Sequence, residues 1–211
     1  YYDSSHVYPI LVSLKNSTCN AALSINDTVK IQARPLPKFF AANASKSFPI
    51  AGCTPLQLQL SDSSKNADSV WYNAISSSGV RVSFSSPSFT LTDTGYYNIT
   101  QFVSNLDGCL DSLVVFNAAY VSPKPILSVA IDSSFPRCVQ KNLRLKINHA
   151  FIDSLLVQWG DGFTNSFASL GNFRTDTISH AYANAGVYAV RIKIRNAFCD
   201  TQVTFSYLVR P

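Results

Sequence analysis

Cysteine is the residue type in this chain with the greatest capacity for covalent chemistry. The five cysteines are Cys19, Cys53, Cys109, Cys138 and Cys199. No two of them form a Cys-x-x-Cys pair, which disfavours structural zinc sites and thioredoxin-like redox chemistry. The remaining use of cysteine is the structural disulfide, which persists in oxidising compartments outside the cytoplasm. The cysteines therefore predict an exported protein.

Candidates for acid–base or metal chemistry are few. Asp93-Thr94-Gly95 spells an aspartic-protease triplet, but that reaction needs two facing carboxylates and the triplet occurs once. Asp161 lies between two glycines, which is typical of a tight turn. Calcium is the open alternative there, although it needs several clustered oxygen ligands and the nearest other acid is Asp153. We expect no catalytic residue, no cofactor and no metal.

Three similar phrases indicate an internal repeat of about ninety residues, long enough for each copy to be a small domain. Each phrase has a Tyr at the start of an alternating stretch, an Asn eight residues later, and a Cys soon after. The matching positions are Tyr8, Asn16 and Cys19; Tyr97, Asn105 and Cys109; and Tyr188, Asn196 and Cys199. Arrays of such domains are usually spacers or adhesive segments.

The repeat suggests how the cysteines pair. Cys53 and Cys138 each precede the first strand of a repeat, while Cys109 and Cys199 each close its last repeated phrase. Pairing Cys53 with Cys109 and Cys138 with Cys199 would close two loops of similar length. Cys19 corresponds to Cys109 and Cys199, so we expect it to be unpaired by truncation, its partner lying upstream. A reactive free thiol is the open alternative.

The pattern of apolar residues and turns predicts an all-β fold. The 211-residue chain has neither Glu nor Met, which favour helices, and is rich in residues that favour strands and turns. Short alternating stretches separated by turn residues favour antiparallel β-sandwiches. In the second repeat we expect strands at 56–60, 69–72, 80–84, 88–91, 97–104 and 112–117.

Two proline-containing linkers, Arg34–Pro37 and Ser122–Pro125, divide the chain, because proline disfavours both helix and sheet interiors. We expect the last strands of a truncated repeat in 1–35, a complete repeat in 38–121 and another in 126–211.

The net charge of +5 is concentrated near the C-terminus. In 143–147 and 190–195, basic and apolar residues alternate, so the bases share one strand face. A solvated outer face is the simplest interpretation. The open alternative is a weak site for acidic polysaccharide or lipid headgroups, and the residues for glycan binding would be Arg191, Lys193 and Arg195. Nucleic acid is not expected, because no aromatic recognition motif accompanies the charge, and no apolar stretch is long enough to span a membrane.

Two further patterns locate structural residues of a sandwich. A turn of the form Asp/Asn-x-Gly-x-Tyr predicts a tyrosine corner, in which the Tyr hydroxyl bonds to nearby backbone. Trp71 and Trp159 match the core tryptophan of the third strand. The corner residues are Asp93, Gly95 and Tyr97 in the second repeat, and Asn184, Gly186 and Tyr188 in the third.

Trp159-Gly-Asp-Gly162, followed by Ser179-His180-Ala-Tyr182 and Gly186-Val-Tyr188, resembles the polycystic-kidney-disease (PKD) domain. The third repeat lacks the family's Phe before Gly160, and the second repeat lacks the Gly-Asp-Gly turn and the His. The resemblance implies seven-stranded immunoglobulin-like sandwiches in an extracellular multi-domain protein, with His180 in a structural role. The cysteine placement is similar to that of large adhesins of gliding bacteria exported by the type IX route.

Five Asp-Ser/Thr-aliphatic tripeptides resemble the O-glycosylation signal of the same bacterial group. The candidate acceptors are Thr28, Ser69, Ser112, Ser154 and Thr177.

We therefore expect a non-catalytic structural or adhesive segment of an extracellular surface protein, acting as a stalk or as cell-surface adhesion repeats. Its expected partners are neighbouring repeats of the same polypeptide and, as a further candidate, cell-surface or extracellular polysaccharide. The open alternatives are a glycan-binding accessory module of a secreted hydrolase and a surface-filament subunit.

Overall fold

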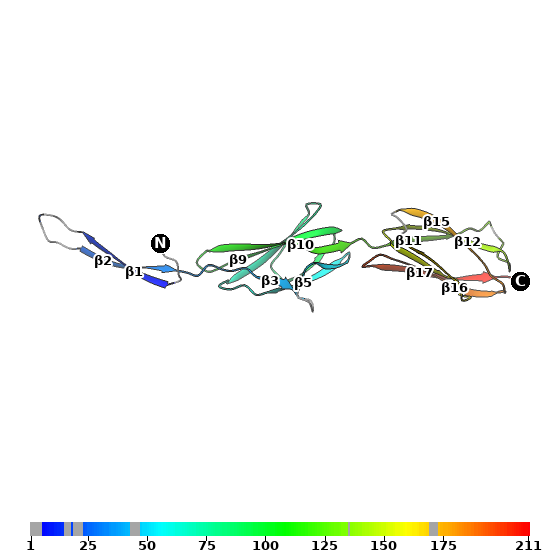
Figure 1. Ribbon diagram of the computed structural model, residues 1–211, viewed down its shortest axis with the longest axis horizontal. Coiled ribbons are helices and arrows are strands. Elements are labelled where there is room, and N and C mark those ends of the chain that lie inside the picture. Colours follow the sequence, from blue (N-terminus) through cyan, green and yellow to red (C-terminus); the bar gives the residue numbers. More distant parts are fainter. Residues whose placement is uncertain (1–5, 15–17, 19–22, 43–46, 135, 169–172) are drawn as a thin grey trace.

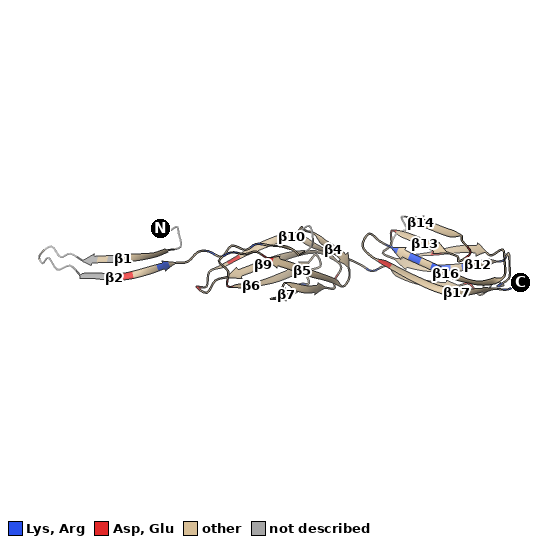
Figure 2. Ribbon diagram, turned by 90° about the horizontal axis from the view of Figure 1, so that it is seen from below, with Lys and Arg blue, Asp and Glu red and all other residues tan. Residues whose placement is uncertain are grey.

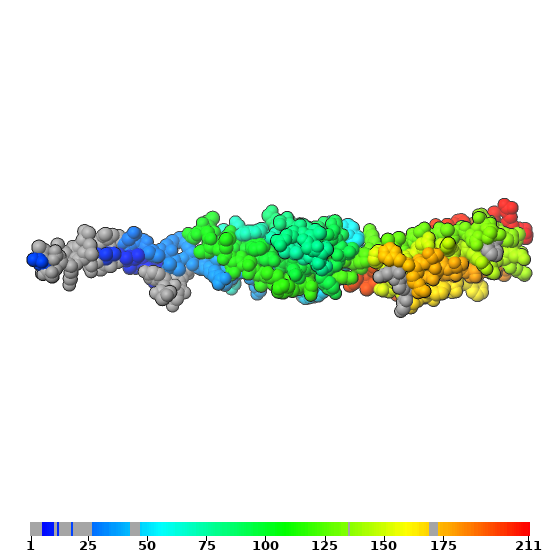
Figure 3. All heavy atoms as spheres, turned by 90° about the horizontal axis from the view of Figure 1, so that it is seen from above, coloured from blue at the N-terminus to red at the C-terminus, as the bar shows by residue number. Residues whose placement is uncertain are grey.

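The computed structural model describes residues 6–14, 18, 23–42, 47–134, 136–168 and 173–211. Within them the regular structure consists of β-strands without a helix. The strands form three bodies that follow one another along a single long axis (Figure 1). The second and third bodies adjoin end to end in the space-filling view (Figure 3).

The first body is a two-stranded antiparallel hairpin of β1 (His6–Leu14) and β2 (Leu23–Ile31). The described part of this region therefore holds the pair of strands expected for the end of a repeat.

The second body is a sandwich of two sheets. One sheet has the order β3-β5-β8 and the other β4-β10-β9-β6-β7. Neighbouring strands are antiparallel except for β4, which runs parallel to the end of β10. The strands are β3 (Phe39–Ala41), β4 (Ile50–Cys53), β5 (Leu56–Asp62), β6 (Ser69–Ser76), β7 (Arg81–Phe84), β8 (Ser88–Leu91), β9 (Gly95–Ser104) and β10 (Leu110–Ser122).

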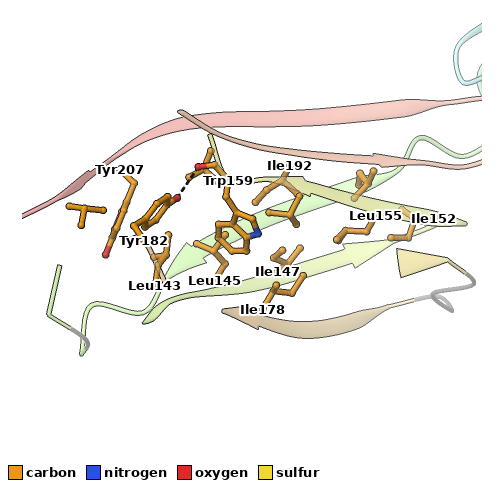
Figure 4. Close-up of a cluster of buried hydrophobic side chains, with 14 residues drawn as sticks. Leu143, Leu145, Ile147, Ile152, Leu155, Trp159, Ile178, Tyr182, Ile192 and Tyr207 are labelled. Carbon is orange, nitrogen blue, oxygen red and sulfur yellow. Dashed lines mark hydrogen bonds between the residues drawn. The ribbon is translucent and has the colours of Figure 1, made fainter. Parts of the chain in front are cut away.

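The third body is a second sandwich, with sheets of order β11-β12-β15 and β14-β13-β16-β17. Alternation along β12 places Leu143, Leu145 and Ile147 inside and the intervening residues outside. These side chains meet Trp159 and Ile192 in the centre of the sandwich (Figure 4). The strands are β11 (Ile126–Ile131), β12 (Asn142–Ala150), β13 (Ser154–Gln158), β14 (Thr164–Ala168), β15 (Arg174–Ala181), β16 (Gly186–Arg195) and β17 (Asp200–Val209).

The predicted fold class, an all-β chain of tandem immunoglobulin-like antiparallel sandwiches, is confirmed. The strands predicted for the second repeat did not include the short β3 and β4, and the last predicted strand ended at Asn117. That strand instead continues to Ser122 past a bulge, where Asn117 has φ 51° and its amide donates to Asn98 Oδ1 at 2.9 Å. Asn117, which was predicted to end the strand, instead belongs to a β-bulge within it.

The turn before β9 and the turn before β16 have the same hydrogen bond. Tyr97 Oη donates to the carbonyl of Asp93 at 3.0 Å, and Tyr188 Oη donates to the carbonyl of Asn184 at 2.9 Å. Gly95 has φ 121°, a conformation that favours glycine. These are the contacts of a tyrosine corner.

The two tryptophans do not occupy equivalent places, so the prediction that Trp71 lies in the core is wrong. Trp159 is fully buried, whereas Trp71 is half-buried and stacks on Phe102, which faces it on β9. Neighbouring residues of a strand point to opposite faces, so Tyr72 enters the core instead. The pairing of β6 with β9 and of β13 with β16 makes Ser69, the first residue of β6, equivalent to Ser154, the first residue of β13. Counted from these two residues, the counterpart of Trp159 is Ala74.

This register predicts different costs for two adjacent substitutions. Tyr72→Ala should destabilise the second repeat by about 3–5 kcal/mol, because it removes a large buried side chain. Trp71→Ala should cost about 1 kcal/mol, because it removes a stacking contact on the outer face. Scanning calorimetry of both variants measures the melting transition of the second repeat. A larger loss for Trp71→Ala would contradict the register.

Candidate functional site at the repeat junction

A disulfide joins the second repeat to the third. Cys53 ends β4, and Cys199 lies directly before β17, 146 residues further along the chain. Their Cα atoms are 5.6 Å apart, a separation typical of disulfides. The bond lies where the two sandwiches adjoin, so it connects successive repeats.

This pairing corrects the prediction for the second repeat, in which Cys53 was paired with Cys109. Cys109 directly precedes β10, while Cys53 lies beside Ser122 at the other end of that strand. β10 has 13 residues, so its ends lie about 40 Å apart. A disulfide requires Cα atoms within roughly 7 Å, so the strand length prevents this bond.

The same reason excludes the predicted pair of Cys138 and Cys199. Cys138 forms a parallel bridge with Arg210 just after β17, whereas Cys199 lies just before it. β17 has 10 residues and therefore separates the two cysteines by about 30 Å. Cys138 is half-buried and Cys109 is exposed, and both are free thiols. The predicted free Cys19 lies outside the described residues.

The turn that carries Cys199 is organised by Asn196. Its Oδ1 accepts hydrogen bonds from the amides of Phe198 (3.0 Å) and Cys199 (2.8 Å). Its Nδ2 donates to the carbonyl of Pro123, in the linker from the second repeat, at 2.9 Å. One side chain therefore shapes the turn and also attaches it to the preceding linker.

Asn105 repeats this arrangement where the hairpin meets the second repeat. Its Oδ1 accepts from the Cys109 amide at 2.9 Å, and its Nδ2 donates to the Ala33 carbonyl at 3.3 Å. An ion pair between Arg34 and Asp111, 3.0 Å between Nη2 and Oδ1, adds to this contact. The recurrent Asn is visible in the sequence, but no role was predicted for it. Its recurrence before each Cys was the available signal.

Aromatic side chains complete the junction between the second and third repeats. The ring of Phe198, in the turn of Asn196, lies 5.5 Å from the ring of Tyr120 near the end of β10. Tyr120 in turn contacts Tyr96 on β9, with 4.7 Å between ring centroids. The junction thus combines a covalent bond, a hydrogen bond to the linker and an apolar contact.

Asp161 forms the turn that was expected of it. Its Oδ1 accepts from the Phe163 amide at 3.1 Å, and its Oδ2 lies 2.6 Å from His180 Nε2. Gly160 has φ 87°, and a Cβ there would lie 2.8 Å from the Ala189 carbonyl oxygen, so only glycine fits. Partial burial alone would raise the pKa of Asp161, but the hydrogen bonds from His180 and Phe163 outweigh it and the pKa is lowered.

Among the described residues, no group of three or more His, Cys, Asp or Glu side chains is placed to hold a metal ion. Nor does that part of the chain include a helix of the length and apolar character needed to cross a membrane.

The basic residues of β16 point outward, as the alternation predicted. Figure 2 shows Lys and Arg along this strand. Arg191 and Arg195 are exposed, but Lys193 forms an ion pair with Asp200 at 2.5 Å and lowers the pKa of that carboxyl. The basic residues of 143–147 lie on β12, in the opposite sheet. The two basic stretches therefore do not form one surface, and polysaccharide binding at β16 stays a prediction.

The five candidate O-glycosylation acceptors all lie on strands. Four are exposed, whereas Ser154 is half-buried and accepts a hydrogen bond from Arg195 Nε at 3.1 Å. Modification of these residues stays a prediction. The exposed acceptors are Thr28 on β2, Ser69 on β6, Ser112 on β10 and Thr177 on β15.

No protein-family profile and no curated protein matches the chain. Among solved structures, fibronectin(III)-like modules of Clostridium thermocellum CbhA align with 82% of this chain and 94% of theirs, at 11% sequence identity and a TM-score of 0.35. A likeness of this strength is too weak to place the chain in a family.

The junction predicts which cysteines are linked in the oxidised protein. Digestion without reductant, after thiols are alkylated, should yield one peptide pair that contains Cys53 and Cys199. Cys109 and Cys138 should both carry the alkyl group. Mass spectrometry of the digest identifies each peptide. Recovery of a Cys53–Cys109 or Cys138–Cys199 pair would contradict the assignment.

The Asp161 contact predicts an acid-sensitive third repeat. Because the folded-state pKa of Asp161 lies below the unfolded value of about 3.9, its stabilisation is present above that pH and is lost as the pH falls through the folded-state pKa. Asp161→Asn should lower the melting temperature of the third repeat at pH 5 and reduce its further loss below about pH 4. Thermal melts over this range measure the effect.

Asp107→Asn is the matched control, since it makes the same charge change in an exposed turn of the second repeat. It should leave the transition of the third repeat unchanged at every pH. Equal acid sensitivity of Asp161→Asn and the unmodified protein would contradict the role of Asp161.

Proposed function

We propose that this chain is a non-catalytic, load-bearing segment of a multi-domain extracellular surface protein. Residues 1–35, 38–121 and 126–211 are successive PKD-like repeats of a stalk or adhesin. The observation that carries the proposal is the disulfide between Cys53 and Cys199, which joins neighbouring repeats rather than the two sheets of one repeat.

The disulfide changes the covalent path that tension follows through the chain. Force applied at the two ends of the chain passes from residue 53 directly to residue 199, so the 146-residue separation is bypassed. Most of both sandwiches lies inside this loop. If they unfolded, the loop could not lengthen the molecule, so the bond limits extension under load.

The other contacts of the junction suit the same role. Asn196 binds the linker at Pro123, and Phe198 packs on Tyr120, so the joint resists bending as well as stretching. The linker itself contains two prolines, which restrict its backbone. A rigid, end-to-end joint is what a spacer between a cell surface and a binding site requires.

The disulfide supports the extracellular location, because disulfides persist in oxidising compartments. The resemblance of the third repeat to PKD domains, the cysteine placement and the Asp-Ser/Thr-aliphatic tripeptides support the gliding-adhesin type of surface protein exported by the type IX route. The exposed Arg191 and Arg195 are a candidate contact for polysaccharide within that role.

Single-molecule stretching between the two chain ends tests the proposal. With the disulfide intact, the fully stretched chain should be shorter by about 500 Å than after reduction, which corresponds to 146 residues at roughly 3.5 Å each. Cys53→Ser should show the longer extension without any reductant.

Cys138→Ser is the matched control, because it removes a free thiol inside the same loop and should leave the extension unchanged. Equal extension of the intact protein and Cys53→Ser would contradict a load-bearing role for the bond.

A further inference from the structure

Cys138 occupies the same structural place in the third repeat that Cys53 occupies in the second. Cys53 lies beside the end of β10, where the Thr54 amide donates to the Ser122 carbonyl at 3.0 Å. Cys138 lies beside the end of β17, where the Val139 amide donates to the Arg210 carbonyl at 2.9 Å. In both places the paired backbone segments run parallel, and the residue after the Cys donates the backbone hydrogen bond.

Cys109 has the same correspondence with Cys199. The Asn105 amide donates to the Cys109 carbonyl at 3.1 Å, and the Asn196 amide donates to the Cys199 carbonyl at 2.9 Å. In both turns the Asn Oδ1 accepts from the amide of the Cys. Within the described residues there are thus two copies of each half of the junction, and one copy of each half is bonded.

The unbonded halves also carry exposed apolar residues at the places that correspond to the aromatic contact of the bonded junction. Strand register makes Val187 and Leu208 the counterparts of Tyr96 and Tyr120, the pair that receives Phe198. Val187 is 69% exposed and Leu208 is 45% exposed. In the turn of Cys109, Leu106 is 89% exposed. Val187 and Leu208 face each other across β16 and β17, so these two exposed apolar side chains can serve as one contact surface.

We propose that Cys138 and Cys109 are the open halves of two further junctions of the same kind, so that disulfides join every successive pair of repeats. Cys138 bonds the cysteine of an Asn-to-Cys turn in another repeat, with Val187 and Leu208 packing on that turn. Cys109 bonds the cysteine that ends a β4-like strand of another repeat. This inference rests on the stalk function and names its partner, a further repeat of this type.

The bond-forming step is an ordinary thiol oxidation. Two thiols lose two protons and two electrons and form one S–S bond. The electrons and protons pass to a disulfide oxidant, such as oxidised glutathione, which becomes two thiols. Cys138 lies beside Arg210 at the end of the third repeat near the C-terminus (Figure 1), where a following repeat would adjoin.

An extended chain tests the proposal directly. Residues 124–211 are repeated after Pro211, so that Lys124-Pro125 follows Pro211 as it follows Pro123 in the protein. The added copy carries Cys138→Ser, which leaves one Cys138 in the molecule. The chain is folded in a buffer of reduced and oxidised glutathione, alkylated and digested without reductant.

We expect a peptide pair that contains Cys138 and the Cys199 of the added copy, together with the Cys53–Cys199 pair. Alkylation of Cys138 should be lost. Cys109 should stay alkylated, because no repeat is added on its side. With Cys199→Ser in the added copy, Cys138 should be fully alkylated again.

Full alkylation of Cys138 in a sample that contains the Cys53–Cys199 pair would overturn the inference, as would dimers of the extended chain that are linked through Cys138. Either result would leave the stretching experiment on the Cys53–Cys199 bond unaffected, so the stalk function is tested separately.

Discussion

The length of the last strand of each sandwich is the constraint on which the junction depends. β10 and β17 are long strands, each directly preceded by a cysteine and with a second cysteine beside its far end. A strand of ten or more residues holds its ends tens of ångströms apart, beyond the reach of any disulfide. Cysteines at opposite ends of one repeat can therefore bond only with cysteines of neighbouring repeats, and the array acquires covalent joints.

Weaker interactions set the geometry that lets this bond form. The Asn-to-Cys turn has to face the preceding linker, and Asn196 ensures this by bonding its own turn through Oδ1 and the Pro123 carbonyl through Nδ2. Asn105 makes the corresponding contacts at the first joint, without a described disulfide. At both joints the Asn therefore attaches its turn to the preceding linker, and at the second joint the disulfide adds a covalent link.

Several residues that could do chemistry are structural in this fold. Asp93, in the protease-like triplet, supplies the carbonyl that receives the Tyr97 hydroxyl. Asp161 closes a turn against His180, which stacks on the buried Trp159. Asp93 thus contributes a backbone carbonyl to its turn, and the two oxygens of the Asp161 carboxylate contact donors from the same repeat.

The sequence by itself determined the all-β class, the equivalence of the cysteines and the turns before β9 and β16, because each depends on local alternation or on a short recurrent phrase. It did not place Trp71, since two adjacent large aromatic residues leave the register of a strand open and only packing against β9 and the opposite sheet chose Tyr72.

The disulfide pairing was also beyond the sequence. The sequence makes Cys53 equivalent to Cys138, and Cys109 equivalent to Cys199. This equivalence is compatible with disulfides inside a repeat or between repeats. Only the tertiary structure decided between them, because it shows that a strand keeps the cysteines of one repeat apart while end-to-end stacking brings Cys53 to Cys199. The distance between two cysteines in the folded protein determines whether they form a disulfide, and their spacing in the sequence does not reveal that distance.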